Sequence, residues 1–243
     1  MTHPTPVFRN HRNAMTLELM SKDTRCEYSF RKTYDYLGLA IDDFHRRLAF
    51  SERTDGMVDL GIPGWLLPAN ALKLYEMAYF CPSDVLELGT FNGLSTRIIL
   101  EGCRRSGRPF EIVTADHDNG ILELARSQLV ANVPNNGALH LFNVDVKQLV
   151  DGLADASRRF GLVFVDHSHT EASVAEVTKR MHEIVTEGGF VLFNDYNDPR
   201  NADFLNEDYG VFQAVEKHLS SEHFNFYGVF GSSGLFRRCL INN

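Results

Sequence analysis

The chain has 243 residues, of which 44% are hydrophobic and 23% charged, a composition that can bury a sizeable core. It carries 24 Lys and Arg against 32 Asp and Glu, a formal net charge of -8 without a basic run, so nucleic acid is not expected as a partner. No apolar run approaches the roughly 20 residues of a membrane-spanning helix, and the first residues do not have the charged and then apolar regions of a signal peptide. The four cysteines are far apart in sequence and have no CxxC spacing. We therefore expect a cytoplasmic protein with reduced thiols and no membrane contact.

The N-terminal third reads as helices and loops. Met1–Asn10 predicts a mobile arm, and apolar residues at three- and four-residue intervals over Tyr28–Leu48 predict a long amphipathic helix. The Gly- and Pro-containing stretch Gly61–Trp65 precedes a second helical pattern over Ala71–Ala78. We expect residues 1–80 to form an arm and a helical cap on the domain that follows, or to pair two subunits as a homodimer.

After Pro82, short apolar runs alternate with helical segments, which is typical of βαβ units and a mostly parallel sheet. The predicted strands are Asp84–Leu88, Glu111–Asp116, Leu139–Val144, Leu162–Asp166, Phe190–Asn194, Asn225–Val229 and Gly234–Arg238. The predicted helices are Leu94–Arg105, Ile121–Val130, Lys147–Ser157, Ala172–Ile184 and Val211–Leu219. Because the last two strands are close in sequence, they should pair antiparallel. The predicted fold class is a doubly wound α/β domain over residues 81–243, with a seven-stranded, mostly parallel sheet that ends in an antiparallel strand pair.

The first predicted strand leads into a glycine-containing turn. Its apolar run ends at Glu87-Leu88 and passes through Gly89 and Gly93 into a helix. Glycines at such a turn let the backbone come close to a ligand at the carboxyl ends of the strands. The spacing is GxxxG rather than GxGxxG, and no GK[ST] follows, which disfavours dinucleotides and nucleoside triphosphates. The alternative is a turn whose glycines serve the backbone alone.

The next two strands also end in acidic residues. Asp116 ends the second strand, where a carboxylate can accept hydrogen bonds from both hydroxyls of a ribose. Asp145 follows the third strand, where it could meet the amino group of an adenine. Each could instead be a solvated carboxylate or a helix cap.

Three features together resemble the class I S-adenosylmethionine-dependent O-methyltransferases: Glu87-Leu88-Gly89-x-x-x-Gly93-x-Ser95, the acidic end of the second strand, and Asp166-His167 at the end of the fourth. The resemblance covers roughly Gly61–Arg238 and is strongest to the catechol O-methyltransferase-like branch and its relatives that methylate sugar and macrolide hydroxyls. It implies a Rossmann-like sheet, S-adenosylmethionine as cofactor and a small-molecule hydroxyl as acceptor. The loop at Gly61–Trp65 would close over the methionine end of the cofactor. The implied cofactor residues are Glu87, Gly89, Thr90, Gly93, Ser95, Asp116, His117, Asp145 and Asp166.

The fourth strand is followed by candidate catalytic residues, Asp166-His167-Ser168-His169. In metal-dependent members of the resembling families the aspartate binds a divalent cation, and a lysine or aspartate beyond it takes the proton from the acceptor hydroxyl. Here His169 stands at the lysine position and Ser168 at the aspartate alternative. A neutral imidazole can accept a proton near neutral pH, so His169 is the predicted base and His167 the second choice. Either histidine could instead cap the next helix or orient Asp166.

The fifth strand ends in Asn194-Asp195, where the related families have Asp-Asn or Asp-Asp. With Asp166 these residues predict an all-oxygen site of net charge -2 for Mg²⁺, or for Ca²⁺ or another divalent cation. The alternative is a polar strand end that binds no metal. Zinc is disfavoured because His167 and His169 are the only close histidine pair and would face opposite sides of a strand.

Three aromatic residues, Trp65, Tyr196 and Phe204, are predicted to line an acceptor pocket, with core packing as the alternative. The function we expect is methyl transfer to a small-molecule hydroxyl of a sugar or secondary metabolite, with catalysis by in-line positioning. Two alternatives stay open. One is a cyclase or lyase that consumes S-adenosylmethionine and releases methylthioadenosine; the other is a non-catalytic cofactor-binding or interaction protein of the same fold.

Overall fold

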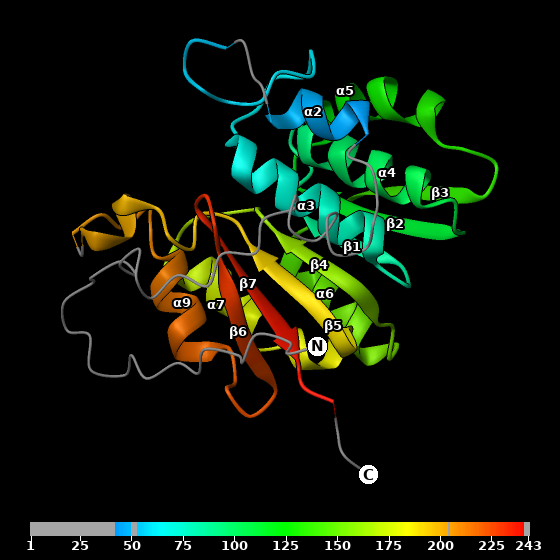
Figure 1. The fold of residues 1–243 in the computed structure, drawn as a ribbon. Coiled ribbons are helices and arrows are strands. Elements are labelled where there is room, and N and C mark those ends of the chain that lie inside the picture. Colours follow the sequence, from blue (N-terminus) through cyan, green and yellow to red (C-terminus); the bar gives the residue numbers. More distant parts are fainter. Residues whose placement is uncertain (1–41, 50–52, 204, 241–243) are drawn as a thin grey trace, which may run out of the picture.

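The computed structural model describes residues 42–49, 53–203 and 205–240 (Figure 1). The predicted arm over Met1–Asn10, most of the predicted helix from Tyr28 and the predicted pocket residue Phe204 lie outside these residues. The end of that helix is present as α2 (Asp43–Ala49), which packs on α3 (Pro68–Phe80) through the rings of Phe44 and Tyr75.

The described residues form a seven-stranded sheet in the order β3-β2-β1-β4-β5-β7-β6. Neighbouring strands from β3 to β5 are parallel, and β7 is antiparallel to both β5 and β6. The strands are β1 (Val85–Leu88), β2 (Phe110–Asp116), β3 (Gly137–Asn143), β4 (Phe160–Val165), β5 (Val185–Phe193), β6 (Phe224–Phe230) and β7 (Ser233–Arg238). This confirms the predicted fold class, including the antiparallel C-terminal pair.

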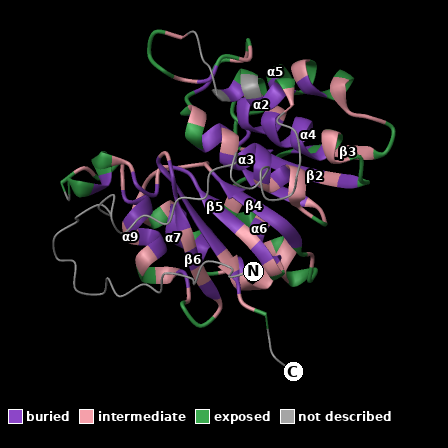
Figure 2. Ribbon diagram, viewed as in Figure 1, coloured by how far each residue is buried: buried purple, intermediate pink, exposed green. Residues whose placement is uncertain are grey.

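Helices cover both faces of the sheet because its central strands are apolar on both sides (Figures 1 and 2). On β1, Leu86 and Leu88 enter the hydrophobic core beneath one helix layer, whereas Val85 enters the core beneath the other. The first layer holds α6 (Val146–Asp155), α7 (Glu171–Thr178), α8 (Met181–Ile184) and α9 (Val211–His218). The second holds α2, α3, α4 (Leu94–Ser106) and α5 (Asn119–Leu129). Two short 3₁₀ helices are η2 (Val130–Asn132) and η3 (Pro199–Ala202).

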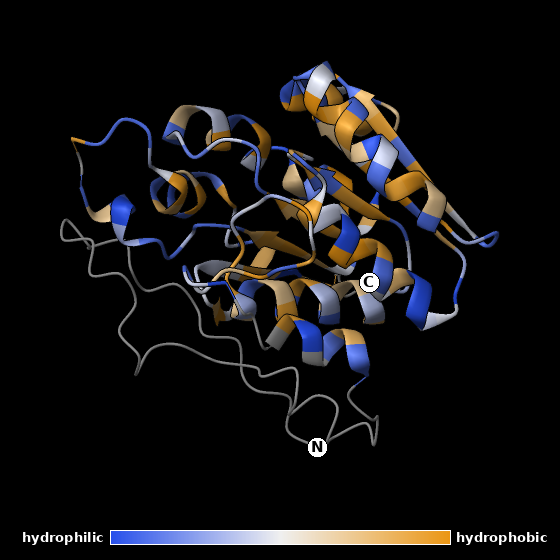
Figure 3. Ribbon diagram, turned by 90° about the horizontal axis from the view of Figure 1, so that it is seen from above, coloured by the Kyte–Doolittle hydropathy of each residue, from blue (hydrophilic) through white to orange (hydrophobic). Residues whose placement is uncertain are grey.

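Hydropathy follows this layering: the strands are mainly hydrophobic, and the helices carry residues of both kinds (Figure 3). Within the described ranges, no helix combines the length and apolar character that crossing a bilayer requires.

The prediction of one helix over Ala172–Ile184 is wrong, because the segment forms α7 and α8 with a break between them. At the end of α7 the Thr178 hydroxyl donates to the Val174 carbonyl, a local bond that competes with regular helix continuation. The strand β5 then begins directly at Val185 rather than at Phe190.

Two elements outside the central βαβ units reach the carboxyl-end edge of the sheet. The tight turn between β6 and β7 passes through Gly231, whose φ is 60°, and places Ser232 beside the end of β5, where its carbonyl accepts from the Asn197 backbone N–H at 2.8 Å. The first turn of α3 brings Asn70 to the same place. Parallel strands end at one edge, so the side chains after β1, β4 and β5 meet there.

Candidate active site

The turn after β1 depends on its two glycines. Gly89 has φ 103°, and a Cβ on it would lie 2.3 Å from the Asp166 carbonyl oxygen. Gly93 has φ 88°, caps α4 and would bring a Cβ to 2.8 Å from Leu129. Between them, Phe91 has φ 44°, and its backbone N–H donates to Asp116 at 2.9 Å. Packing against neighbouring elements therefore requires both glycines, and the turn is tied directly to the acidic end of β2.

Glu87 is fully buried beneath this turn. Its Oε2 accepts hydrogen bonds from Thr114 at 2.6 Å and Thr96 at 2.5 Å. Burial raises the pKa of Glu87 to about 7, although the hydroxyls of Ser95, Thr114 and Thr96 act in the opposite direction. The Thr90 hydroxyl also turns inward and bonds Thr114. Of the predicted cofactor residues, Glu87, Thr90 and Ser95 thus form a buried polar cluster that supports the turn from below.

The other predicted cofactor residues lie at the ends of β2 and β3. The Asp116 carboxylate sits next to the turn, where its second oxygen accepts from the Asp118 backbone N–H at 3.1 Å. The side chain of His117 is 88% exposed. Asp145 caps α6, with Oδ1 accepting the backbone N–H groups of Lys147 and Gln148. Asp145 thus caps a helix through Oδ1, while its contact with an adenine amino group and the ribose role of Asp116 both remain predictions.

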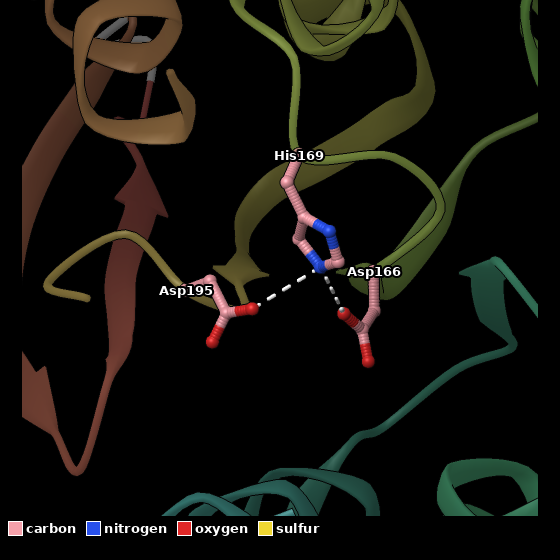
Figure 4. Close-up of side chains that lie close together, drawn as sticks. All are labelled: Asp166, His169 and Asp195. Carbon is pink, nitrogen blue, oxygen red and sulfur yellow. Dashed lines mark ion pairs between the residues drawn. The ribbon is translucent and has the colours of Figure 1, made fainter. Parts of the chain in front are cut away.

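Two carboxylates and an imidazole converge at the ends of β4 and β5 (Figure 4). His169 Nε2 lies 3.1 Å from Asp195 Oδ2 and 3.8 Å from Asp166 Oδ1. Asp195 reaches this position with φ 53°, a left-handed conformation that is uncommon for residues other than glycine. Contacts with Asp166 and Asp195 raise the pKa of His169 to about 9. At neutral pH, His169 in this arrangement is therefore an imidazolium between two acids.

An aromatic stack holds the plane of His169. The Tyr209 ring is parallel to the imidazole within 2°, at a centroid distance of 4.8 Å, and the Gly210 backbone N–H donates to the His169 carbonyl at 2.7 Å. The Arg200 guanidinium lies over the Tyr209 ring, 3.9 Å from its centroid, and pairs with Asp198 at 2.8 Å. Tyr209 and Arg200 were not predicted from the sequence, because the spacing of the segment between β5 and α9 gives no sign of contact with His169.

His167 is placed differently from His169. Its Nδ1 accepts the backbone N–H of Ser168, which puts the proton of the neutral ring on Nε2. That Nε2 is buried and has no hydrogen-bond partner in the part of the chain that the structure describes. Burial, reinforced by the nearby His169, lowers the pKa of His167 to about 4. His167 is therefore neutral at pH 7, with its lone pair already used, and it is not placed to take a proton from an acceptor.

The predicted oxygen triad is rearranged. Asn194 donates through Nδ2 to Asp166 at 3.1 Å, while its Oδ1 accepts from Asn70 at 2.7 Å and Ser233 at 3.0 Å. The amide oxygen thus faces away from Asp166, and Asn194 would have to turn and give up both donors to act as an oxygen ligand. Among the residues that the structure describes, Asp166, His169 and Asp195 form the group whose possible ligand atoms all lie within 4.8 Å of one another.

The prediction that Tyr196 lines a pocket is wrong. Tyr196 is 2% exposed, packs among core rings including Phe236 and Phe212, and donates its hydroxyl to Glu216 at 2.7 Å. It reaches the core from the turn at residues 194–197 that follows β5, directly after Asp195 with its φ of 53°.

Trp65 lies at the surface beside the glycine turn. It is 70% exposed, and its ring centroid is 5.6 Å from that of Phe91. The preceding Gly64 packs so closely on the first residue of α4 that a Cβ would lie 2.7 Å from Leu94. The loop over Gly61–Trp65 therefore borders the turn, and its closing over the methionine end of the cofactor remains a prediction.

Comparison with known proteins gives a family match for part of the chain. Residues 86–196, which span the glycine turn and both carboxylates, match the family model described as a methyltransferase domain. A search of curated protein sequences finds no match.

Several solved structures of methyltransferases share the fold of this chain. One is CalS11, a TDP-rhamnose 3'-O-methyltransferase of calicheamicin biosynthesis, with TM-score 0.53 and 19% identity over 69% of this chain and 76% of that one. Another is the O-methyltransferase TomG from Streptomyces achromogenes, in complex with S-adenosylmethionine, with TM-score 0.54 and 18% identity over 86% and 95% of the two chains. A third is an O-methyltransferase from Bacillus cereus in complex with S-adenosylhomocysteine, with TM-score 0.57 and 12% identity over 86% and 96%. These similarities confirm the class I methyltransferase fold that the glycine turn and the strand ends predicted.

Proposed function

We propose that this methyltransferase transfers the methyl group of S-adenosylmethionine to a hydroxyl of a small molecule, such as a sugar or another natural product. The observation that carries the proposal is the placement of His169 between Asp166 and Asp195, at the strand ends next to the glycine turn. The comparisons support it in two ways: TomG is in complex with S-adenosylmethionine, and CalS11 methylates a sugar hydroxyl.

The charge of the strand ends fits a cationic cofactor. Burial raises the pKa of Glu87 and of Asp166, and each is raised further by a neighbouring acid, Asp166 for Glu87 and Asp195 for Asp166. A positively charged ligand group would relieve this repulsion, and S-adenosylmethionine carries a sulfonium and an ammonium. Asp116, held at the turn by Phe91, is the group that would accept its ribose hydroxyls. When bound, the cofactor supplies an already activated methyl group.

His169 is the group that takes the proton of the acceptor. With the cofactor bound as methyl donor, Nε2 of His169 would accept the proton that the acceptor hydroxyl gives up on methylation. This needs the neutral imidazole, and the two carboxylates hold its pKa at about 9. Asp166 and Asp195 then stabilise the imidazolium that forms, while Tyr209 keeps the ring in plane.

A divalent cation fits the same residues. Asp166, Asp195 and His169 would hold it, and a set of two carboxylates and one imidazole suits Mn²⁺ or another transition ion better than Mg²⁺. When bound, such an ion lowers the pKa of a coordinated hydroxyl. The cation and the proton on His169 compete for the same carboxylates, so metal assistance and imidazolium formation are alternatives at this site.

The proposal is tested by incubating the purified protein with S-adenosylmethionine and a panel of hydroxyl acceptors, including nucleotide sugars and phenols, with Mn²⁺, with Mg²⁺ and with EDTA. Mass spectrometry follows the nucleoside products, and calorimetry follows cofactor binding. Acceptor-dependent S-adenosylhomocysteine is the expected product. Methylthioadenosine formed without acceptor would replace the proposal with a cyclase or lyase, and binding without turnover on any acceptor would favour a non-catalytic protein.

A further inference from the structure

Asn70, in the first turn of α3, joins a buried hydrogen-bond network at the edge of the candidate site. It is 2% exposed. Its Nδ2 donates to Asn194 Oδ1 at 2.7 Å and to Ser232 Oγ at 2.8 Å, and its Oδ1 accepts the Ser232 backbone N–H at 3.0 Å. Three segments far apart in sequence, α3, the end of β5 and the β6–β7 turn, therefore meet through one side chain.

Both branches of this network end on the carboxylates that contact His169. Ser232 Oγ donates to Asp195 Oδ1 at 3.1 Å, and Asn194 Nδ2 donates to Asp166 Oδ1 at 3.1 Å. Asp195 thus meets His169 through Oδ2 and Ser232 through Oδ1, whereas Asp166 meets both His169 and Asn194 through Oδ1.

A backbone group fixes the direction of every bond in the network. The Ser232 N–H can only donate, so the atom of Asn70 that faces it is the oxygen. The Asn70 nitrogen therefore faces Asn194, which must present its own oxygen there and its nitrogen to Asp166. Asn70 in this way decides that Asn194 is a donor to the site.

The backbone of the β6–β7 turn is shaped to admit Asn70. Gly231 has φ 60°, and a Cβ on it would lie 1.8 Å from Asn70 Oδ1. No side chain fits at that position without moving Asn70 out of the network. The close approach of the β6–β7 turn to α3 thus depends on glycine at position 231 and on asparagine at position 70.

We propose that Asn70 and Ser232 are positioning residues for methyl transfer, which hold Asp166 and Asp195 in the spacing that encloses His169. The proposal rests on the proposed function. Both residues lie outside residues 86–196, so the part of the chain that matches the methyltransferase family does not complete its own site. Buried networks of this kind act as a unit, because a half-satisfied member carries the cost of an unpaired polar group.

The test compares Asn70→Ala and Ser232→Ala in the full chain. Removal of a group that orients a reacting side chain typically costs 10- to 100-fold, so we expect kcat to fall by roughly that factor. The acceptor KM and the affinity for S-adenosylmethionine, measured by calorimetry, should change less than about twofold. Thr178→Val is the matched control, since it removes one buried hydroxyl that bonds the Val174 carbonyl, away from the network. Ser232→Thr keeps the hydroxyl and should retain most of the activity.

A double-mutant cycle shows whether Asn70 acts through Asn194. The double variant Asn70→Ala/Asn194→Ala should be no slower than Asn194→Ala alone, whereas independent effects would multiply. Gly231→Ala should reproduce the loss seen with Asn70→Ala. If kcat of both single variants equals that of the control, the proposal is overturned.

A spectroscopic readout separates this proposal from the proposed function. The ¹⁵N chemical shift of His169 Nε2, recorded at fixed pH without acceptor, should move in Asn70→Ala and Ser232→Ala and stay constant in Thr178→Val. If the wild-type chain methylates no acceptor, the proposed function is refuted. The chemical shift of His169 can still be compared between wild type and variants, and it still shows whether Asn70 and Ser232 affect His169. An unchanged shift in folded variants would refute the network. Should Asn70→Ala fail to fold, Ser232→Ala and Ser232→Thr carry the comparison.

Discussion

His169 Nε2 lies 3.1 Å from Asp195 Oδ2, a contact between the segment after β4 and the end of β5. The two strands are parallel neighbours, so their carboxyl ends bring these side chains to one edge. The contact places a protonated imidazole where the sequence predicted a cation between carboxylates, and it sets the protonation chemistry of the site.

Methyl transfer should depend on pH through His169. Because the base must be neutral and its pKa is raised to about 9, kcat/KM should rise about tenfold per pH unit below pH 9 and level off above it. His169→Asn should lower kcat by about 10²- to 10⁴-fold and remove the rise. His167→Asn, the comparison variant, should keep the same profile. A flat wild-type profile between pH 7 and about 9 would contradict the assignment of His169 as base.

Glu87→Gln should change stability and cofactor binding in opposite directions. Burial raises the pKa of Glu87 from 4.5 to about 7, so its stabilising neutral form dominates at low pH and is lost as the pH rises through 7. At pH 8 the variant should be more stable than wild type, by up to about 3 kcal/mol, and at low pH the gain should vanish. Its affinity for S-adenosylmethionine should fall, since an acid near the cationic group is lost. Denaturant melts at both pH values and calorimetry measure the two effects; equal stability of both proteins at pH 8 would show that Glu87 ionises without cost.

Tyr209 should act through its ring. Tyr209→Phe keeps the face that stacks on His169 at 4.8 Å and should retain kcat within a few fold. Tyr209→Ala removes the stack, frees the imidazole to rotate and should lower kcat by about tenfold or more. Steady-state kinetics give kcat of the two variants. An equal fall in kcat in both would show that the hydroxyl of Tyr209, rather than its ring, is what matters.

Divalent cations should compete with the proton on His169. Binding of Mn²⁺ to Asp166, His169 and Asp195 requires the neutral imidazole, so it should release about one proton near pH 7 and tighten as the pH rises. Calorimetry in buffers of different ionisation enthalpy counts that proton. Asp195→Asn should abolish the binding, while Asp198→Asn, whose wild-type carboxylate pairs with Arg200, serves as the control. Cation binding without proton release would remove His169 from the ligand set.

Trp65→Ala should affect ligands more than folding. At 70% exposure the indole contributes little to the core, so the free energy of unfolding should change by less than about 0.5 kcal/mol. If Trp65 and Phe91 border the acceptor or the cofactor, the KM for one of these ligands should rise severalfold. Thermal melts measure the change in stability, and steady-state kinetics measure the change in KM. Leu205→Ala is the control, because Leu205 is also apolar and is 90% exposed.

The sequence by itself determined the sheet, the crossover helices and the glycine turn. Each follows from local patterns: apolar runs bounded by turns, glycines with left-handed φ at 89 and 93, and a connection too short for a crossover before β7. The same patterns located Asp166, His169 and Asp195, because residues after parallel strands must share one edge.

Only the tertiary structure decided what these residues do to one another. The proton on His169 depends on two acids from different strands, and its plane depends on Tyr209. The amide of Asn194 is oriented by Asn70, which is 124 residues away in the chain. Tyr196 joined the core rather than the site. Side-chain direction and protonation are set by the groups that other elements bring within a few ångströms, and local sequence carries no record of those distances.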